Sequence, residues 1–186
     1  MKARLISVKG NWIDVKNSCM ATIAKECTEK EPNSSWKKRI LLAEHSPIRQ
    51  ITIKCKWEEL KSWVSVHFVR HKIGIEHWVR SQRTDRTNIN RDELRQDSLI
   101  EHEFEANCQA FITISRKRLC NCAAKETREA WEEVLEKIKD VQQELYSVCV
   151  PDCIYRGWCY EMKSCNYYLT DEYKKKLSEY RKIFTK

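Results

Sequence analysis

Apolar and polar positions alternate along this chain in two spacings, which predict strands and helices in turn. A short apolar run predicts a buried strand at 4–8, and an every-second-residue pattern predicts another at 48–57. Stretches with apolar residues three or four apart predict helices. They span residues 34–44, 58–71, 103–118, 125–148 and 167–186. The stretch 72–98 has no steady period and is rich in charge and amides, so we expect loop and short turns there.

This order of elements predicts an α+β fold in which helix predominates, with a small antiparallel or mixed sheet. The length of 186 residues, with 41% hydrophobic residues, suits one compact domain with a core of its own. We expect a body over 1–166, with a cysteine-rich segment at 149–165, and a C-terminal amphipathic helix at 167–186 as part of the same domain. No apolar run approaches a membrane span and the start lacks a secretory apolar region, so we expect a soluble, cytoplasmic protein.

Basic residues outnumber acidic ones by 35 to 27, a net charge of +8 that favours an anionic partner such as a nucleotide or nucleic acid. The segment 70–91 has six Lys or Arg and two acidic residues, which is half of that excess. A solvated surface strip is the alternative. No glycine-rich phosphate loop is present, so arginine side chains would have to hold a phosphate. The candidates are Arg70, Arg80, Arg83, Arg86, Arg91 and Arg118.

Ten cysteines and a group of three histidines are possible metal ligands. Packed thiols are the favoured interpretation of the cysteines, with structural zinc and a redox pair as alternatives, because the chain has no zinc knuckle of the CxxC type among its clustered cysteines. The weak metal candidates are Cys153, Cys159 and Cys165. The histidines at 67, 71 and 77 have basic neighbours that repel a divalent cation, which favours hydrogen bonding or packing.

Four stretches of the sequence resemble the flavin-dependent thymidylate synthase (ThyX) family. The text RHKIGIEHWVRSQR is similar to the family signature RHRxxSxNxxSxR: Arg70 and His71 match, and residues 81–83 give the closing SxR if one residue is inserted. LLAEHSPIRQ resembles the family's helix end followed by Ser-Pro. Asn90-Arg91 and the stretch NCQAFITISRKRLCNCAAKETRE follow in the family's order, so the resemblance covers roughly residues 36 to 130.

The resemblance implies a ThyX-like α+β domain that forms a homotetramer, binds FAD, and methylates dUMP with methylenetetrahydrofolate and NADPH. It places Arg118 on the uracil, where a fixed cation stabilises developing negative charge. The residues that it places on the substrate are His67, Arg70, Arg80, Ser81, Gln82, Arg83, Arg91 and Arg118. Those that it places on the flavin are Ser46, Arg70, His71, Lys72, Asn107, Gln109 and Thr113.

The sequence departs from the family pattern at several of these positions. Lys72 stands where the family has Arg, Thr113 where Asn is usual and Cys122 where His is usual, and the segment between residues 83 and 91 is short. Two alternatives therefore stay open. One is a related flavin-dependent modifier of another pyrimidine nucleotide. The other is a non-catalytic protein that binds nucleotides or nucleic acid on the same fold.

Overall fold

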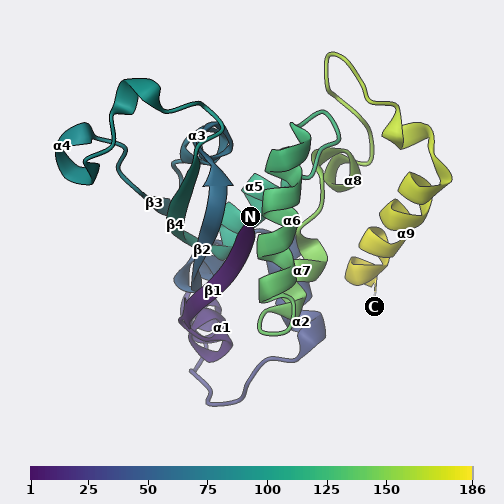
Figure 1. Cartoon of the computed structure of the whole chain (residues 1–186). Helices are drawn as coiled ribbons and strands as arrows, with labels where there is room; N and C mark the ends of the chain where they lie inside the picture. Colours follow the sequence, from purple (N-terminus) through teal and green to yellow (C-terminus); the bar gives the residue numbers. More distant parts are fainter. Residues whose placement is uncertain (186) are drawn as a thin grey trace.

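One four-stranded antiparallel sheet organises the molecule, shown in Figure 1. The structure is a computed structural model that describes residues 1–185. The strand order is β1-β2-β4-β3, so β1 and β3 are the sheet edges. The strands are β1 (Lys2–Lys9), β2 (Thr52–Lys61), β3 (Ile75–Val79) and β4 (Leu99–Asn107).

Helices cover one face of this sheet and extend away from it (Figure 1). The α-helices are α1 (Trp12–Ala21), α2 (Ser34–Leu42), α3 (Ser62–Val69), α4 (Thr84–Thr87), α5 (Cys108–Arg118), α6 (Lys125–Ile138), α7 (Gln143–Val148), α8 (Asp152–Arg156) and α9 (Asp171–Thr185). Short 3-10 turns are η1 (Ser46–Gln50), η2 (Arg91–Glu93) and η3 (Tyr167–Leu169). Asparagines at 11, 33 and 107 cap α1, α2 and α5 by accepting a backbone N–H of the first turn.

Aromatic side chains form the centre of the core between the sheet and helices α3, α5 and α6. The Trp57 ring on β2 lies 4.4 Å from Phe68 of α3 and 4.6 Å from Phe104 of β4, measured between ring centroids. Trp131 of α6 packs against Phe68, Phe104 and Phe111, and all these side chains are fully buried. The indole N–H of Trp57 donates to the carbonyl of Ala130 at 2.8 Å, which fixes α6 against the sheet.

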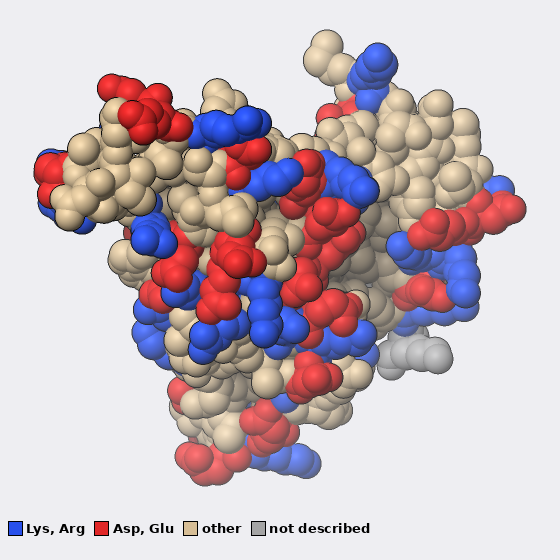
Figure 2. Space-filling view, viewed as in Figure 1, with Lys and Arg blue, Asp and Glu red and all other residues tan. Residues whose placement is uncertain are grey.

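The opposite face of the sheet carries a ladder of ion pairs. Lys54 pairs with Glu103 at 2.6 Å and Lys56 with Glu101 at 2.9 Å, across the β2–β4 register. Figure 2 shows basic and acidic side chains interleaved across the face in view. Exposed pairs of this kind contribute at most about 1 kcal/mol each. Because acidic side chains lie between the basic ones, the net charge of +8 does not form one continuous patch on the face in view.

The α+β class and the small antiparallel sheet are confirmed, while several elements differ from the prediction. Residues 103–107 belong to strand β4 instead of a helix, and 75–79 form strand β3 where loop was expected. Strand β2 continues through Lys61, with a bulge near Glu59, whose φ is +57°. The predicted helix 125–148 is two helices, and α9 begins at Asp171. Residue 186, part of the predicted last helix, lies outside the described residues. Within residues 1–185, no helix is long and apolar enough to cross a membrane.

Candidate nucleotide site

Arg118, at the end of α5, is held against the end of α3 by two hydrogen bonds. Its Nε donates to the ring Nε2 of His71 at 2.9 Å, and a terminal nitrogen donates to the carbonyl of His67. That carbonyl belongs to the last turn of α3, where backbone acceptors lack a partner in the helix and carry partial negative charge. The end of one helix therefore fixes the guanidinium at the end of another.

No carboxylate among the described residues neutralises the positive charge of Arg118. Both of its acceptors are uncharged, and among residues 1–185 it forms no ion pair. Burial, and then the charge of Arg70, lowers the pKa of Arg118, but a guanidinium remains protonated at any ordinary pH. Arg118 is thus a half-buried, oriented cation that can bind an anionic group.

Two histidines beside Arg118 are held in the neutral form. Burial, followed by the charges of Arg118 and His77, lowers the pKa of His71 to about 4. Burial also lowers the pKa of His67, with Arg118 and Arg70 adding to the effect, and its ring contacts the Thr127 hydroxyl at 2.8 Å. An arginine can only donate, so the Nε2 atom of His71 is unprotonated. Protonation of His71 would remove the acceptor that orients Arg118.

We expect folding stability to fall in acid because of these histidines. A lowered folded-state pKa means that the unfolded chain binds more protons below about pH 6.5, so the free energy of unfolding decreases as pH drops toward 4. For His71 the loss is about 1–2 kcal/mol after allowance for solvent screening of its half-buried ring. Chemical denaturation between pH 7 and pH 4 should show a shallower decline in His71→Gln than in the exposed control His45→Gln. Equal declines in both variants would contradict this.

A second part of the site is a hollow of about 370 Å³ between α3, the edge strand β3 and the segment that follows it. Arg80, Gln82, Arg83 and Arg91 line it. Arg83 pairs with Asp85 through two hydrogen bonds, of 3.0 and 2.7 Å. The structure thus brings together four of the residues predicted for the substrate. Apolar side chains from Val66, Val69, Val79 and Ile100 complete the wall.

Of the other predicted substrate residues, Ser81 and Arg70 are not among those that line the hollow, whereas Arg91 is. Arg91 forms no ion pair with any residue in 1–185, and its exposed side chain is available to a ligand. Ser81 accepts a hydrogen bond from the backbone N–H of Arg83 at 3.2 Å. Arg70 is exposed and close enough to Arg118 to affect its pKa.

The residues predicted for the flavin lie mainly around the start of α5. Asn107 accepts the N–H of Ala110 at 2.9 Å as the cap of that helix. Gln109 donates to the carboxylate of Glu44 at 2.5 Å. Its own side-chain oxygen is buried and has no hydrogen-bond partner among residues 1–185. Thr113 lies one turn further along and donates to the Gln109 carbonyl. Ser46 starts η1 and Lys72 lies on the turn before β3, both exposed.

The cysteines with weak metal potential lie together in a different region. Cys153, Cys159 and Cys165 line a cavity of about 20 Å³, together with Cys120. All ten cysteines are free thiols, and burial raises the pKa of Cys153 and of Cys120. No group of three or more potential ligands in residues 1–185 is arranged to hold a metal ion.

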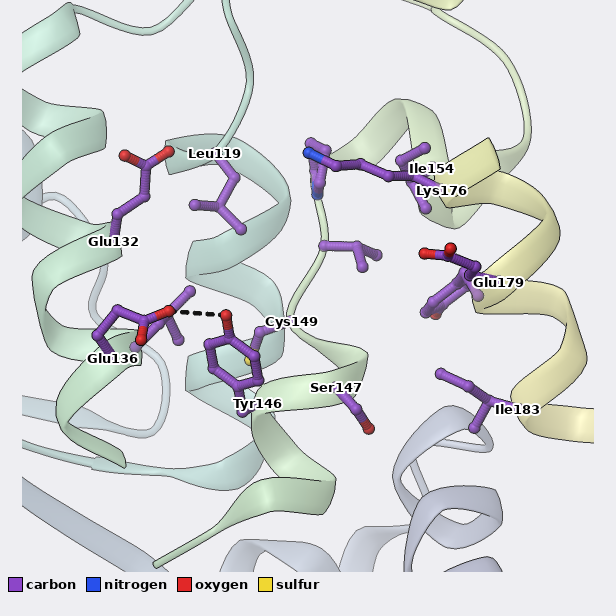
Figure 3. Close-up of a pocket in the computed structure, with 14 residues that line it drawn as sticks. Leu119, Glu132, Glu136, Tyr146, Ser147, Cys149, Ile154, Lys176, Glu179 and Ile183 are labelled. Carbon is purple, nitrogen blue, oxygen red and sulfur yellow. Dashed lines mark hydrogen bonds between the residues drawn. The ribbon is translucent and has the colours of Figure 1, made fainter. Parts of the chain in front are cut away.

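A larger hollow of about 520 Å³ separates α9 from α6 and α7 (Figure 3). Leu135 of α6 and Ile154 of α8 are among its lining residues. The Tyr146 hydroxyl donates to Glu136 at 2.8 Å along one side. Glu179 and Ile183 of α9 form the opposite wall. None of the predicted site residues lines this hollow, so it is separate from the candidate nucleotide site.

Sequence reasoning missed the partners that lie behind the site. His102 of β4 contacts His77 at 2.9 Å and Ser65 at 3.0 Å, and Thr127 contacts His67. His102 was missed because residues 99–102 were assigned to no element and the rest of the strand, from residue 103, was interpreted as helix. The signal that could have found it is the alternation of Ile100, His102, Phe104 and Ala106, which places a histidine among the buried positions of a strand.

The fold is that of the ThyX-like flavin-dependent thymidylate synthases. The structure of flavin-dependent thymidylate synthase ThyX from Helicobacter pylori, complexed with FAD and dUMP, matches with a TM-score of 0.67 and 11% identity, over 81% of this chain and 100% of that one. The UMP/dUMP methylase PolB from Streptomyces cacaoi, bound with 5-Br dUMP, matches with a TM-score of 0.62 and 10% identity, over 79% and 93%. No protein-family model and no curated protein matches the sequence. The resemblance drawn from the sequence is confirmed at the level of the fold.

Proposed function

We propose that this chain is a flavin-dependent enzyme that methylates C5 of dUMP, forming dTMP with methylenetetrahydrofolate as carbon donor and NADPH as reductant. The observation that carries the proposal is Arg118: a half-buried guanidinium with uncharged acceptors and no carboxylate partner among residues 1–185. Such a cation stabilises negative charge that develops on a pyrimidine ring. The ThyX-like fold, and the dUMP or 5-Br dUMP bound in its solved neighbours, support this assignment.

The basic hollow beside α3 supplies the groups that a nucleotide phosphate requires. Arginine forks bind phosphate oxygens through two parallel hydrogen bonds. We assign the phosphate to Arg91 and Arg80, with Arg83, Ser81 and Gln82 at the phosphate and sugar. His67 and Arg70 lie on the Arg118 side, next to the proposed position of the base. One nucleotide would then bridge the two parts of the site.

The residues around α5 fit a flavin by their chemistry. The unpartnered oxygen of Gln109 is a buried acceptor for a ring N–H, and Arg70 and Lys72 are exposed cations that suit a pyrophosphate. Ser46, His71, Asn107 and Thr113 complete the proposed flavin set. When bound, FAD would supply the reducing equivalents that convert the transferred one-carbon unit to a methyl group. The chain's own residues bind and orient both molecules.

A substitution at Gly74, in the turn before β3, tests the assignment of the flavin residues. Gly74 has φ +73°, and a Cβ there would lie 2.6 Å from the Asn107 amide nitrogen. Gly74→Ala should lower the free energy of unfolding by about 1–2 kcal/mol because of the left-handed backbone. Displacement of the Asn107 cap of α5 should lower it by about 0.5–2 kcal/mol more. The variant should also bind FAD more weakly. Denaturant unfolding and a fluorescence titration with FAD measure both effects.

Gly157 provides a matched control for this substitution. It has φ +74°, but a Cβ there would meet only the mobile end of the Arg181 side chain, at 2.7 Å. Gly157→Ala should therefore lower the free energy of unfolding only through its left-handed backbone, and it should keep normal FAD affinity. Equal FAD affinity in the two variants would exclude Asn107 from the flavin site.

Exposed apolar residues around the site support assembly into a homotetramer with shared active sites. Ile73, on the turn before β3, is 90% exposed, and Trp78 of β3 is 50% exposed. Val66 of α3, which lines the basic hollow, is 48% exposed. Apolar groups gathered around a binding site are typical of surfaces that a partner covers. Light scattering of the purified protein measures the assembly state.

The experiment that tests the function is direct product analysis. Purified protein is incubated with dUMP, FAD, NADPH and methylenetetrahydrofolate, and the nucleotide is analysed by mass spectrometry. Formation of dTMP is the expected result. A different modified pyrimidine, tested with UMP in parallel, would indicate the related modifier, and salt-sensitive binding of nucleic acid without turnover would indicate the non-catalytic alternative.

A further inference from the structure

The wall of the basic hollow is connected to Arg118 by a line of hydrogen bonds that ends at the backbone of His71, whose own ring then contacts Arg118. Ser65 of α3, which lines the hollow, contacts His102 Nδ1 at 3.0 Å. His102 Nε2 contacts His77 Nδ1 at 2.9 Å, and His77 Nε2 contacts the carbonyl of His71 at 3.0 Å. The ring of the same His71 then accepts from Arg118. We call Ser65, His102 and His77 the buried histidine chain.

The backbone carbonyl of His71, at one end of the buried histidine chain, determines on which ring nitrogen each proton lies. A carbonyl only accepts, so His77 carries its proton on Nε2 and offers Nδ1 as an acceptor. His102 must then donate from Nε2, which leaves its Nδ1 to accept from the Ser65 hydroxyl. When both rings are neutral, this pattern allows a single tautomer for each. A tautomer change in either histidine would place two donors or two acceptors face to face.

Burial maintains this neutral state. His102 is fully buried and Ser65 is 3% exposed. Burial, and then His77, lowers the pKa of His102 to about 3. Burial also lowers the pKa of His77, although the His71 carbonyl and the nearby Glu76 partly oppose that shift. The buried histidine chain therefore keeps one hydrogen-bond pattern throughout the neutral pH range.

We propose that His77 and His102 are positioning residues: they hold the His71 backbone so that its ring nitrogen meets Arg118 Nε, and they fix Arg118 relative to the phosphate hollow through Ser65. The catalytic consequence rests on the proposed function. The geometric part of the proposal does not rest on the proposed function, because it concerns contacts within the protein alone. His71 lies on the turn between α3 and β3, and the His77 bond ties its carbonyl to the strand.

Nitrogen-15 NMR of histidine-labelled protein tests the geometry without any assay of activity. At pH 7 we expect protons on Nε2 of His77 and His102, and on Nδ1 of His71. A charged His77, or a proton on Nε2 of His71, would overturn the proposal. In His77→Leu, hydrogen exchange at Arg118 Nε–H should be at least about 10-fold faster than in the wild type, because its acceptor is no longer held in place. An unchanged exchange rate would also overturn it.

A kinetic comparison separates positioning from a merely structural role. His77→Leu should lower kcat for dUMP about 10- to 100-fold, with KM for dUMP within about 3-fold because the arginines of the hollow are untouched. His77→Gln, whose amide can both donate and accept, should recover most of kcat, and the exposed control His45→Leu should match wild type. A larger change in KM than in kcat would contradict positioning. If the proposed function is wrong, the wild type shows no turnover. The NMR measurement still decides whether His77 and His102 position Arg118.

Discussion

Arg118→Ala is expected to reduce dTMP formation by about 100- to 1,000-fold, the usual loss when one oriented charge-stabilising group is removed. Alanine also leaves the His71 ring nitrogen and the His67 carbonyl without their donor. A modest loss of stability should accompany the loss of turnover, with the circular dichroism spectrum unchanged. Arg118→Lys should recover little activity, because an ammonium group cannot reproduce the planar fork that meets both acceptors.

The neighbouring residue provides the control for this variant. Lys117 is on the same last turn of α5, with its side chain 58% exposed and its nearest carboxylate, of Asp152, at 3.9 Å. Lys117→Ala removes the same unit of charge from the same helix end and should keep normal turnover. If Arg118→Ala were as active as Lys117→Ala, the role assigned to Arg118 would be wrong.

Arg91→Ala is expected to weaken dUMP binding roughly 10- to 150-fold, which corresponds to one charge-assisted hydrogen bond of about 1.5–3 kcal/mol. The fold should be unaffected, because the Arg91 side chain is exposed and forms no ion pair within residues 1–185. Isothermal titration with dUMP measures the change. Deoxyuridine, which has no phosphate, should bind wild type and variant equally.

The control for Arg91 lies on the same segment. Arg95 is exposed and pairs with Asp97 at 3.0 Å, and it is not among the residues that line the basic hollow. Arg95→Ala should leave dUMP affinity unchanged. A similar loss of affinity in both variants would indicate a general charge effect, and Arg91 would then be removed from the phosphate site.

The sequence predicted the parts of the fold whose periodicity was unambiguous. The helix over α6 was predicted from apolar residues three and four apart, and they are buried as expected. Strand β4 was missed because Phe104, Cys108 and Phe111 also fit a helical spacing, so the two periods overlap at the point where strand passes into helix. The break between α6 and α7 carries no glycine or proline that could have indicated it.

The candidate site was predictable only where it depended on residue type. Arginines in a basic segment indicated a phosphate site, and the structure places Arg80, Arg83 and Arg91 around one hollow. The partners of Arg118 could not be predicted in the same way, because its contacts with His71 and His67 join residues 47 and 51 positions apart. Contacts between distant segments depend on how the helices pack, and local periodicity carries no information about that packing.

The central claim, a flavin and a pyrimidine nucleotide bound at one site, is tested most directly by the visible absorption spectrum. Purified protein is titrated with FAD and then with dUMP, and Arg91→Ala is titrated in parallel. We predict a bound-flavin spectrum that shifts on addition of dUMP, with the shift requiring higher dUMP concentrations in Arg91→Ala. A protein that binds no FAD, or a flavin spectrum that dUMP leaves unchanged, would contradict the account.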